Sequence, residues 1–475
     1  MTDFLARCRA ILVDNQLVIT DADGMAPYLT DWRGRFTGRA RAVLRPGTTE
    51  QVARLVRLCA ELHVPVVPQG GRTGLVLGSV PDVSGEAVVL SLTRMNRVRE
   101  VDAANRTITL DAGCILQQVQ DAAAAEGCLF PLSLAAEGSC TIGGNLSTNA
   151  GGTAVLRYGN TRDLCLGLEV VTAQGEIWSS LRGLRKDNTG YSLRDLFIGA
   201  EGTLGVITGA VMKLYPMPRA SITALVAVSS PAQALALLTM VQDHCGPALT
   251  AFELMSQVCM DLVAKHYPDL PHPFRHRHPQ YALLEVASSE SEEHAVGLLE
   301  GAIGAALEAG IAADAAVASS VAQSRGLWQI REHIPLAQAA AGKNIKHDIS
   351  LPVSSIPAFL EATDALLLRA FPGCQLVTFG HLGDGNLHYN VAPPDGVAHD
   401  DFLGHQDAVN HIVHDSVDRF GGSFSAEHGV GALKRSDMAR YKSAVEVRMM
   451  QAIKQALDPL GIMNPGKILP PGCVA

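Results

Sequence analysis

The chain has 475 residues, of which 47% are apolar and 18% charged, and its formal net charge is −9. This length exceeds what one hydrophobic core organises, so two or three domains are expected. The composition is typical of a globular enzyme rather than a membrane protein, and the net negative charge without a long basic run argues against nucleic acid as a partner. An early acid, Asp3, and the lack of a small-residue cleavage site argue against a signal peptide, which predicts a cytoplasmic protein.

Ten cysteines are scattered from Cys8 to Cys473 without a Cys-x-x-Cys pair. A chain of this size needs no disulfides for stability, so we expect reduced cysteines in the core.

The first elements alternate between helix and strand. Thr48 and Gln51 form a capping box that predicts the start of a helix, and a short strand follows at 64–67. The strand leads into the glycine-rich loop 68–79, but Pro81, Asp82 and Gly85 exclude the helix that a Rossmann fold would place next, and 87–90 reads as a strand. Closely spaced glycines let backbone amides approach a pyrophosphate, so this loop is a candidate phosphate cradle of another kind.

A second glycine-rich segment, 138–152, is poor in bulky apolar residues. Two such segments about 70 residues apart favour one extended cofactor bound by both. Strands are expected at 170–173 and 206–214, which makes the part of the chain before Pro218 an α+β unit.

A second α+β pattern begins near Ser221. Its expected strands and helices are 222–228, 232–244, 281–286, 290–308, 347–353, 356–370 and 401–420. We therefore divide the chain into a first unit with the candidate cofactor segments (1–218), a second unit that carries the histidine pair (219–422) and a turn-rich C-terminal segment (423–475), which is expected to return to the first unit.

His381 and His388 flank the turn sequence Asp384-Gly385. A two-residue type I′ turn there would pair 381 directly with 388 and place both imidazoles on one face of a hairpin, close enough to share a metal ion. Glu427 and His428 add a carboxylate and another imidazole. Together these residues predict a His-His-Glu metal site with a spare base, whereas the histidine groups at 272–278 and 405–414 lack such a pattern and are expected to be structural.

Several segments closely resemble FAD-dependent D-2-hydroxyglutarate dehydrogenases, which belong to the vanillyl-alcohol-oxidase type of flavoproteins. The likeness covers nearly the whole chain. The segments that carry it are 68–79, 139–152, 184–191, 196–208, 380–390 and 464–468. The resemblance implies an α+β fold with an FAD-binding domain and a substrate (cap) domain, whose antiparallel sheet is flanked by helices and covers the flavin.

The resemblance also implies roles for individual residues. His381, His388 and Glu427 would bind a divalent metal, with Zn²⁺ expected first and Mn²⁺, Fe²⁺ or Co²⁺ as alternatives. His428 would be the catalytic base, and Arg331, Lys346 and Asn390 would bind substrate. The residues implied for FAD are Pro68, Gln69, Gly70, Gly71, Arg72, Thr73, Gly74, Gly78, Ser79, Pro131, Gly138, Ser139, Ile142, Gly143, Gly144, Asn145, Thr148, Asn149, Gly151, Gly152, Glu201, Gly205, Ile207 and Asn464. The phosphate loop lacks a histidine for a covalent link, so dissociable FAD is expected.

One position departs from the family pattern. The enzymes specific for glutarate carry a threonine four residues after the arginine, where this chain has Pro335. The expected reaction is oxidation of a D-2-hydroxy acid, D-2-hydroxyglutarate or D-malate, to the 2-oxo acid by hydride transfer to flavin N5, and D-lactate or glycolate oxidation is the alternative. Two further alternatives are an electron-carrying flavin subunit and a structural zinc protein, but the open three-ligand site with its base disfavours both.

The electrons would pass on to an electron-transfer flavoprotein or a quinone, because a Rossmann fingerprint for NAD is absent from the sequence. A homodimer is the default expectation for the assembly.

Overall fold

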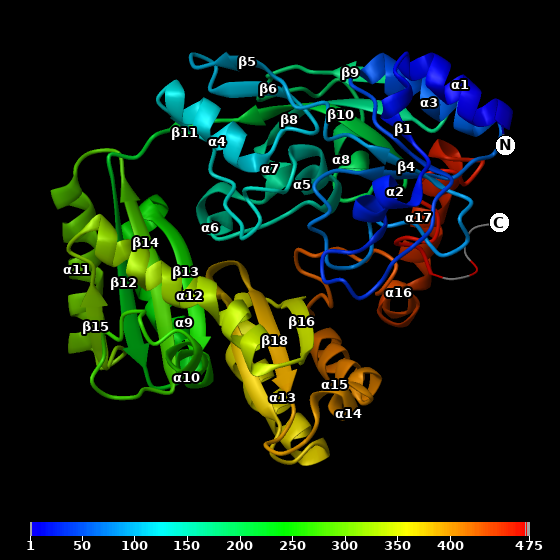
Figure 1. The fold of residues 1–475 in the computed structure, drawn as a ribbon. Coiled ribbons are helices and arrows are strands. Elements are labelled where there is room, and N and C mark those ends of the chain that lie inside the picture. The colour runs from blue at the N-terminus through cyan, green and yellow to red at the C-terminus, as the bar shows by residue number, and fades with distance from the viewer. Residues whose placement is uncertain (1, 471, 473–475) are drawn as a thin grey trace. The chain divides into compact units, whose positions relative to one another are not determined.

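The computed structural model describes residues 2–470 and 472, and these form two compact units. Unit 1 comprises Met1–Gly152, Gly159–Met217 and Glu427–Ala475, and unit 2 comprises Thr153–Tyr158 and Pro218–Ala426. Figure 1 shows the two units as a ribbon. Sequence reasoning did not anticipate that the short segment 153–158, which contains helix α6 (Val155–Tyr158), is part of unit 2.

Unit 1 contains two main sheets. One has the strand order β1-β2-β4-β3, and the other has the order β5-β6-β10-β8-β9 and is antiparallel throughout. The strands are β1 (Val18–Ile19), β2 (Ala42–Leu44), β3 (Val66–Gln69), β4 (Val88–Ser91), β5 (Val98–Asp102), β6 (Thr107–Asp111), β8 (Cys165–Thr172), β9 (Ile177–Ser180) and β10 (Gly205–Lys213), and a small pair joins β7 (Cys128–Leu129) to β11 (Tyr215–Pro216).

One helix of unit 1, α3 (Thr49–Glu61), begins at the predicted signal. Thr48 caps α3 by accepting a hydrogen bond from the Gln51 amide at 3.2 Å, which confirms the predicted helix start. The chain passes from β3 to the parallel strand β4 without a helix, so the exclusion of a Rossmann turn is also confirmed. The helices are α1 (Thr2–Leu12), α2 (Ala22–Leu29), α3 (Thr49–Glu61), α4 (Leu116–Ala125), α5 (Ile142–Thr148), α7 (Thr161–Leu164), α8 (Leu193–Phe197), α16 (Arg435–Tyr441) and α17 (Ala444–Leu457).

Unit 2 is built on a seven-stranded sheet with the order β15-β12-β14-β13-β17-β18-β16. Every neighbouring pair is antiparallel, as expected. The strands are β12 (Ala220–Val228), β13 (Leu249–Ser256), β14 (Gln280–Ser288), β15 (Asp314–Val317), β16 (Ile345–Ser350), β17 (Gln375–His381) and β18 (Asn386–Ala392). The helices are α9 (Pro231–Cys245), α10 (Gln257–His266), α11 (Glu292–Glu308), α12 (Val321–Ala341), α13 (Ile356–Ala370), α14 (His399–Leu403) and α15 (Gln406–Arg419).

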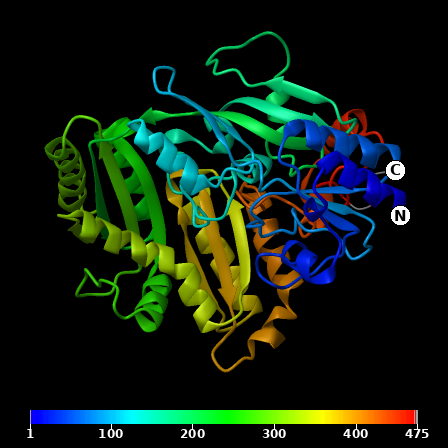
Figure 2. The same cartoon turned by 45° about the horizontal axis from the view of Figure 1, so that its top comes forward.

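The two faces of this sheet carry different cores. Residues of α9, α11, α13 and α15 pack on one face, and residues of α10 and α12 pack on the other. Along β18 the alternation is direct: Leu387, Tyr389 and Val391 belong to the first core, which leaves His388 and Asn390 on the face of α12. Figure 2 shows the long helix α12, in yellow-green, crossing this face of the sheet.

A half-buried acid on the opposite face allows a test of stability against pH. Asp364 of α13 accepts a hydrogen bond from the Tyr389 hydroxyl at 2.5 Å, and burial raises its pKa from 3.8 to about 6 despite that bond. The folded chain therefore holds this proton more tightly than the unfolded chain, and stability falls as pH rises from about 4 to about 6. A shift of this size corresponds to roughly 3 kcal/mol.

The variant Asp364→Asn keeps an acceptor for the Tyr389 hydroxyl. We expect its Tm to equal that of the wild type near pH 4 and to be several degrees higher than that of the wild type at pH 7.5. Glu361→Gln, an exposed change on the same helix, is the control. An equal effect of Asp364→Asn at both pH values would contradict the prediction.

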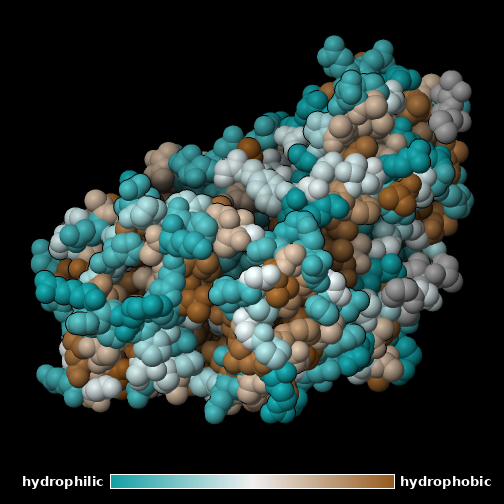
Figure 3. All heavy atoms as spheres, turned by 60° about the horizontal axis from the view of Figure 1, so that its bottom comes forward, coloured by the Kyte–Doolittle hydropathy of each residue, from teal (hydrophilic) through white to brown (hydrophobic). Residues whose placement is uncertain are grey.

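The surface mixes residue types. Figure 3 shows hydrophilic and apolar residues interspersed over one face, and large exposed apolar side chains include Trp32, Val321 and Tyr191. Within the described chain, each helix is too short or too polar to cross a membrane. The nine cysteines that the structure describes are buried and free, as expected, and Cys473 lies outside the described residues.

Candidate functional site

The predicted histidine hairpin exists, but its turn differs from the prediction. Residues Leu382–Asp384 form a 3₁₀ turn and Gly385 has a φ of +86°, so the connection is four residues long rather than two. His381 consequently pairs with Asn386, and His388 pairs with Phe379. The predicted direct 381–388 pairing is wrong by two residues, yet a shift of two keeps the same face, and the imidazole centroids lie 5.8 Å apart as diagonal neighbours.

The register of four adjacent strands gathers polar residues on the face that α12 covers. Glu253 of β13 pairs with His381, and Asp348 of β16 pairs with His388. Two residues further along the same two strands, Lys346 pairs with Asn390. Paired residues point to the same side of a sheet, so these groups form a continuous polar patch across β13, β17, β18 and β16.

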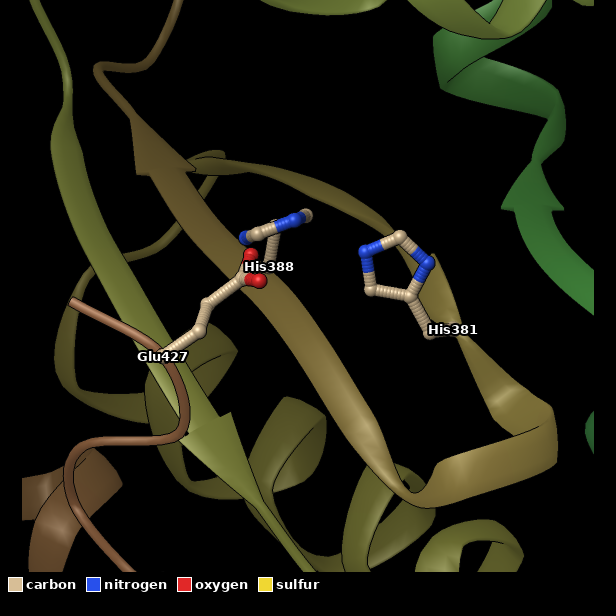
Figure 4. Close-up of side chains that lie close together, drawn as sticks. All are labelled: His381, His388 and Glu427. Atoms are coloured by element: carbon tan, nitrogen blue, oxygen red, sulfur yellow. The ribbon is translucent and has the colours of Figure 1, made fainter. Parts of the chain in front are cut away.

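His381, His388 and Glu427 form a group that could hold a metal ion. Each offers a ligand atom, and these atoms lie within 4.8 Å of one another. Glu427 directly follows Ala426, the last residue of unit 2. Figure 4 shows the Glu427 carboxylate beside the His388 ring, while one ring nitrogen of His381 is directed toward them. Two imidazoles and one carboxylate are a donor set that suits catalytic zinc, so the residues fit a divalent metal.

His428 is part of a second group of the same kind. Its ring, the Glu427 carboxylate and the Asp348 carboxylate offer ligand atoms within 4.8 Å of one another. Asp348 is 3% exposed and accepts hydrogen bonds from the Asn386 amide at 3.0 Å and from the Ala426 backbone at 3.3 Å. Sequence reasoning did not find Asp348, although Ile345, Ile349 and Leu351 mark an alternating pattern and Asp348 is the one acid at the positions between them.

Arg331 is a buried residue of α12 and is linked to His381 through the carboxylate of Glu253. Its Nε donates to Glu253 Oε2 at 2.6 Å, its guanidinium carbon lies 4.8 Å above the Phe379 ring, and Glu253 Oε1 also contacts His381 Nδ1. Burial opposes ionisation of Glu253, but Arg331 and His381 outweigh it and hold the pKa of this carboxyl below its usual value. The terminal nitrogens of Arg331 make no hydrogen bond to the described residues, so they can donate to a ligand.

The other two predicted substrate residues differ in exposure. Lys346 is exposed, whereas Asn390 is 3% exposed and donates to Gln338 Oε1 of α12 at 3.0 Å. Pro335 lies inside α12, one turn after Arg331. Because proline lacks an N–H, the Arg331 carbonyl has no helical donor there. Pro335, the position at which this chain departs from the family pattern, therefore lies one helical turn from Arg331.

In unit 1 the two glycine-rich segments pack against each other. A Cβ at Gly70 would overlap the Thr141 hydroxyl, and one at Gly71 would overlap the Ser139 carbonyl oxygen. The backbone is also unusual, since Arg72, Asn149, Glu201 and Asn464 have φ values between 41° and 57°. Such conformations concentrate at ligand-binding sites.

Unsatisfied polar atoms support a cofactor at these segments. Gln69 Oε1, Thr141 Oγ1 and Asn464 Oδ1 are buried and have no hydrogen-bond partner among the residues that the structure describes. Buried acceptors without partners are rare, so a donor-bearing ligand fits here. Thr141 was not among the predicted FAD residues; it precedes Ile142 and could have been inferred from that neighbour.

Two of the predicted FAD residues have structural contacts. The Glu201 carboxylate accepts hydrogen bonds from the backbone of Val430 at 2.7 Å and Gly431 at 2.9 Å. The Asn464 side chain donates to the carbonyls of Gly78 and Glu201 at 2.8 and 2.7 Å. These hydrogen bonds connect the C-terminal segment to Gly78 of the glycine-rich loop 68–79 and to Glu201, all within unit 1.

The chain matches two known families and is similar to several named proteins. Residues 217–468 match the family described as FAD linked oxidases, C-terminal domain, and residues 40–180 match the FAD binding domain family. The D-2-hydroxyglutarate dehydrogenase of Xanthomonas citri pv. viticola is 40% identical over 94% of this chain and 93% of its own length. That of Stutzerimonas stutzeri is 40% identical (96% and 97% covered), and the mitochondrial enzyme of Danio rerio is 39% identical (95% and 83% covered).

Solved structures agree on the fold. The p-cresol methylhydroxylase structure aligns with a TM-score of 0.78 at 17% identity and covers 98% of this chain and 96% of its own. The 4-ethylphenol oxidase of Gulosibacter chungangensis aligns with a TM-score of 0.75 at 18% identity, with 99% and 97% covered. The predicted α+β fold of the vanillyl-alcohol-oxidase type is confirmed. The chain therefore belongs to the FAD-linked oxidase family, together with the D-2-hydroxyglutarate dehydrogenases.

Proposed function

We propose that this protein is a metal-assisted, FAD-dependent dehydrogenase that oxidises a D-2-hydroxy acid, D-2-hydroxyglutarate or D-malate, to the corresponding 2-oxo acid. The observation that carries the proposal is the group formed by His381, His388 and Glu427, whose ligand atoms lie within 4.8 Å of one another. Relatives named D-2-hydroxyglutarate dehydrogenase, about 40% identical over most of both chains, support the choice of substrate. Zn²⁺ is the proposed metal, because two imidazoles and one carboxylate are a zinc donor set.

When bound, FAD would accept the two electrons of the oxidation, and the divalent cation would lower the pKa of the substrate hydroxyl. The protein's own residues have three tasks. His381, His388 and Glu427 would hold the divalent cation. His428 takes the hydroxyl proton as the general base, since one ring nitrogen of a neutral imidazole is an acceptor.

The third task is to hold the substrate in one orientation. Arg331 is suited to a carboxylate, because its planar guanidinium presents parallel donors and its Nε is already fixed by Glu253. Lys346 adds a second positive charge from an exposed position of β16, and its paired residue Asn390 adds an amide. Two cations favour a dicarboxylate over a monocarboxylate.

A second candidate is a D-lactate or glycolate dehydrogenase. Pro335 favours it, because this position lies one turn after Arg331 and cannot supply the hydroxyl of the threonine found in the glutarate enzymes.

The remaining parts of the proposal concern partners and location. We propose an electron-transfer flavoprotein or a quinone as the acceptor, a homodimer as the assembly and dissociable FAD as the cofactor. The cytoplasmic location predicted from the sequence is also part of the proposal; the relative of Arabidopsis thaliana is mitochondrial by name.

The test is anaerobic reduction of the protein-bound flavin, followed by its absorbance, with D-2-hydroxyglutarate, D-malate, D-lactate and glycolate in turn. We expect fast bleaching by a D-dicarboxylate, none by its L-enantiomer, and loss of bleaching after treatment with a chelator and its return with Zn²⁺. Dithionite is the control for a reducible flavin. Preference for lactate or glycolate would favour the second candidate, and bleaching that survives complete metal removal would refute the metal-assisted mechanism.

A further inference from the structure

Glu253 is a fully buried acid that has no assigned role. It lies in the middle of β13, is 0% exposed, and is the one charged residue in the strand sequence from Leu249 to Ser256. Both carboxylate oxygens are engaged, since Oε2 accepts from Arg331 Nε at 2.6 Å and Oε1 contacts His381 Nδ1. One carboxylate thus connects a candidate substrate residue to a candidate metal ligand, entirely within unit 2.

The chemistry of this arrangement fixes the tautomer of His381. A carboxylate only accepts hydrogen bonds, so the ring nitrogen that faces it, Nδ1, has to carry a proton. The lone pair is then left on Nε2, the other ring nitrogen. Figure 4 shows one ring nitrogen of His381 directed toward His388 and Glu427 and the other directed away from them. A carboxylate behind a metal-binding histidine also raises the basicity of the ligand and fixes the ring orientation.

Aromatic packing restricts the side chains of Arg331, Glu253 and His381. The Arg331 guanidinium lies 4.8 Å above the Phe379 ring, and the His388 ring lies 5.0 Å from the same ring. Phe379 is 2% exposed and pairs with His388 across the hairpin. Arg331, Glu253 and His381 therefore have little room for alternative side-chain positions.

We propose that Glu253 is a positioning residue that sets both the metal affinity of the site and the orientation of Arg331, by accepting His381 Nδ1–H on one oxygen and Arg331 Nε–H on the other. This inference rests on the proposed metal function. It implies that the metal site and the substrate clamp are coupled, because a displacement of the carboxylate changes both.

The variant Glu253→Gln distinguishes a role of Glu253 as a hydrogen-bond acceptor from a role in packing alone. Glutamine has nearly the same shape but only one acceptor, so its oxygen can serve Arg331 or His381 but not both. The charged Arg331 is the stronger donor, so the glutamine oxygen is expected to serve Arg331 and the NH₂ group to face His381 Nδ1. This arrangement favours the tautomer with the proton on Nε2, which leaves Nε2 without a lone pair for a metal. Glu253→Asp keeps both acceptors on a shorter side chain and should restore binding in part.

The structure offers a matched control. Glu285 of β14 lies on the same face of the sheet, paired with Ala251, and also bonds to α12, since the Trp328 indole donates to Glu285 Oε2 at 3.0 Å. It accepts from Thr250 and contacts neither His381 nor Arg331 in any hydrogen bond or ion pair among the described residues. Glu285→Gln thus makes the same chemical change beside the same helix without reaching the metal group.

The experiment measures Zn²⁺ affinity of the FAD-loaded protein after chelator treatment, by competition with a chromophoric chelator, together with zinc content by elemental analysis. We expect Glu253→Gln to weaken binding about 10- to 100-fold, Glu253→Asp to fall between it and the wild type, and Glu285→Gln to stay within about threefold of the wild type. Arg331→Gln should keep metal affinity and raise KM. Where Glu253→Gln alone does not fold, Glu253→Asp carries the test, because it keeps the negative charge that pairs with Arg331 while its shorter side chain withdraws from His381 Nδ1, and zinc binding at the wild-type level by this variant would overturn the role of Glu253.

The outcomes distinguish this inference from the proposed function. Wild-type protein that binds zinc, with Glu253→Gln binding it equally well, would overturn the role of Glu253 and leave the metal function in place. Wild-type protein that binds no divalent metal would overturn both.

Discussion

Replacement of His388 by alanine is expected to abolish stoichiometric metal binding and to lower kcat/KM for the hydroxy acid by roughly 10²- to 10⁴-fold, because polarisation by a metal is worth several kcal/mol in the transition state. His388 lies on β18 with its ring 5.8 Å from that of His381 and beside the Glu427 carboxylate. Removing one of three protein ligands leaves a pair that holds a divalent ion weakly. Metal content by elemental analysis and steady-state kinetics measure the two effects.

The flavin provides an internal control for this variant. The proposed FAD residues belong to unit 1 and His388 belongs to unit 2, so His388→Ala should retain its flavin content and spectrum. His276→Ala changes an exposed histidine in the proline-rich loop between α10 and β14 and should leave both metal content and kinetics at wild-type values. A His388→Ala protein that keeps full metal content, or that loses metal without losing activity, would be inconsistent with the proposed site.

Local patterns predicted the hairpin of β17 and β18 and a strand overlapping β16, but neither β13 nor α12. Alternation along β18 put His388 and Asn390 on one face, and Asp384-Gly385 marked the reversal of the chain. The register could not be predicted, because it depends on the conformation that the connection adopts: the 3₁₀ turn at Leu382–Asp384 lengthens the loop and moves the pairing by two residues. A shift of one residue would have separated the two imidazoles onto opposite faces.

Contacts between strands that are distant in the sequence could not be predicted from the sequence alone. Glu253 is 128 residues from His381, and only the pairing of β13 with β17 brings them into register. Its charge within the apolar strand 249–256 was a signal that this position is paired or functional, since an isolated buried acid is costly. The partner could not be named, because the order β14-β13-β17-β18 is set by long-range packing and not by a local pattern.

The second large effect is expected at the phosphate loop, where Gly71→Ala should yield protein that retains little or no FAD through purification. A Cβ at Gly71 would overlap the Ser139 carbonyl oxygen and lie 3.0 Å from the Cys140 Cα, and both are backbone atoms of the second glycine-rich segment. Backbone cannot rotate away as a side chain can, so the two segments have to separate. Forced overpacking of this kind typically costs about 1–3 kcal/mol, and here the strain falls on the proposed cofactor cradle.

The measurement is the ratio of flavin to protein absorbance after purification, followed by titration of the cofactor-free protein with FAD. Gly304→Ala is the matched control, because Gly304 lies inside α11 with open space where a Cβ would lie, and alanine favours helix more than glycine does. Gly304→Ala should keep full flavin content and gain slightly in thermal stability. If Gly71→Ala instead bound FAD as tightly as the wild type, the close packing of 68–79 against 138–152 would be unnecessary for the cofactor, and the cradle would have to be sought elsewhere in unit 1.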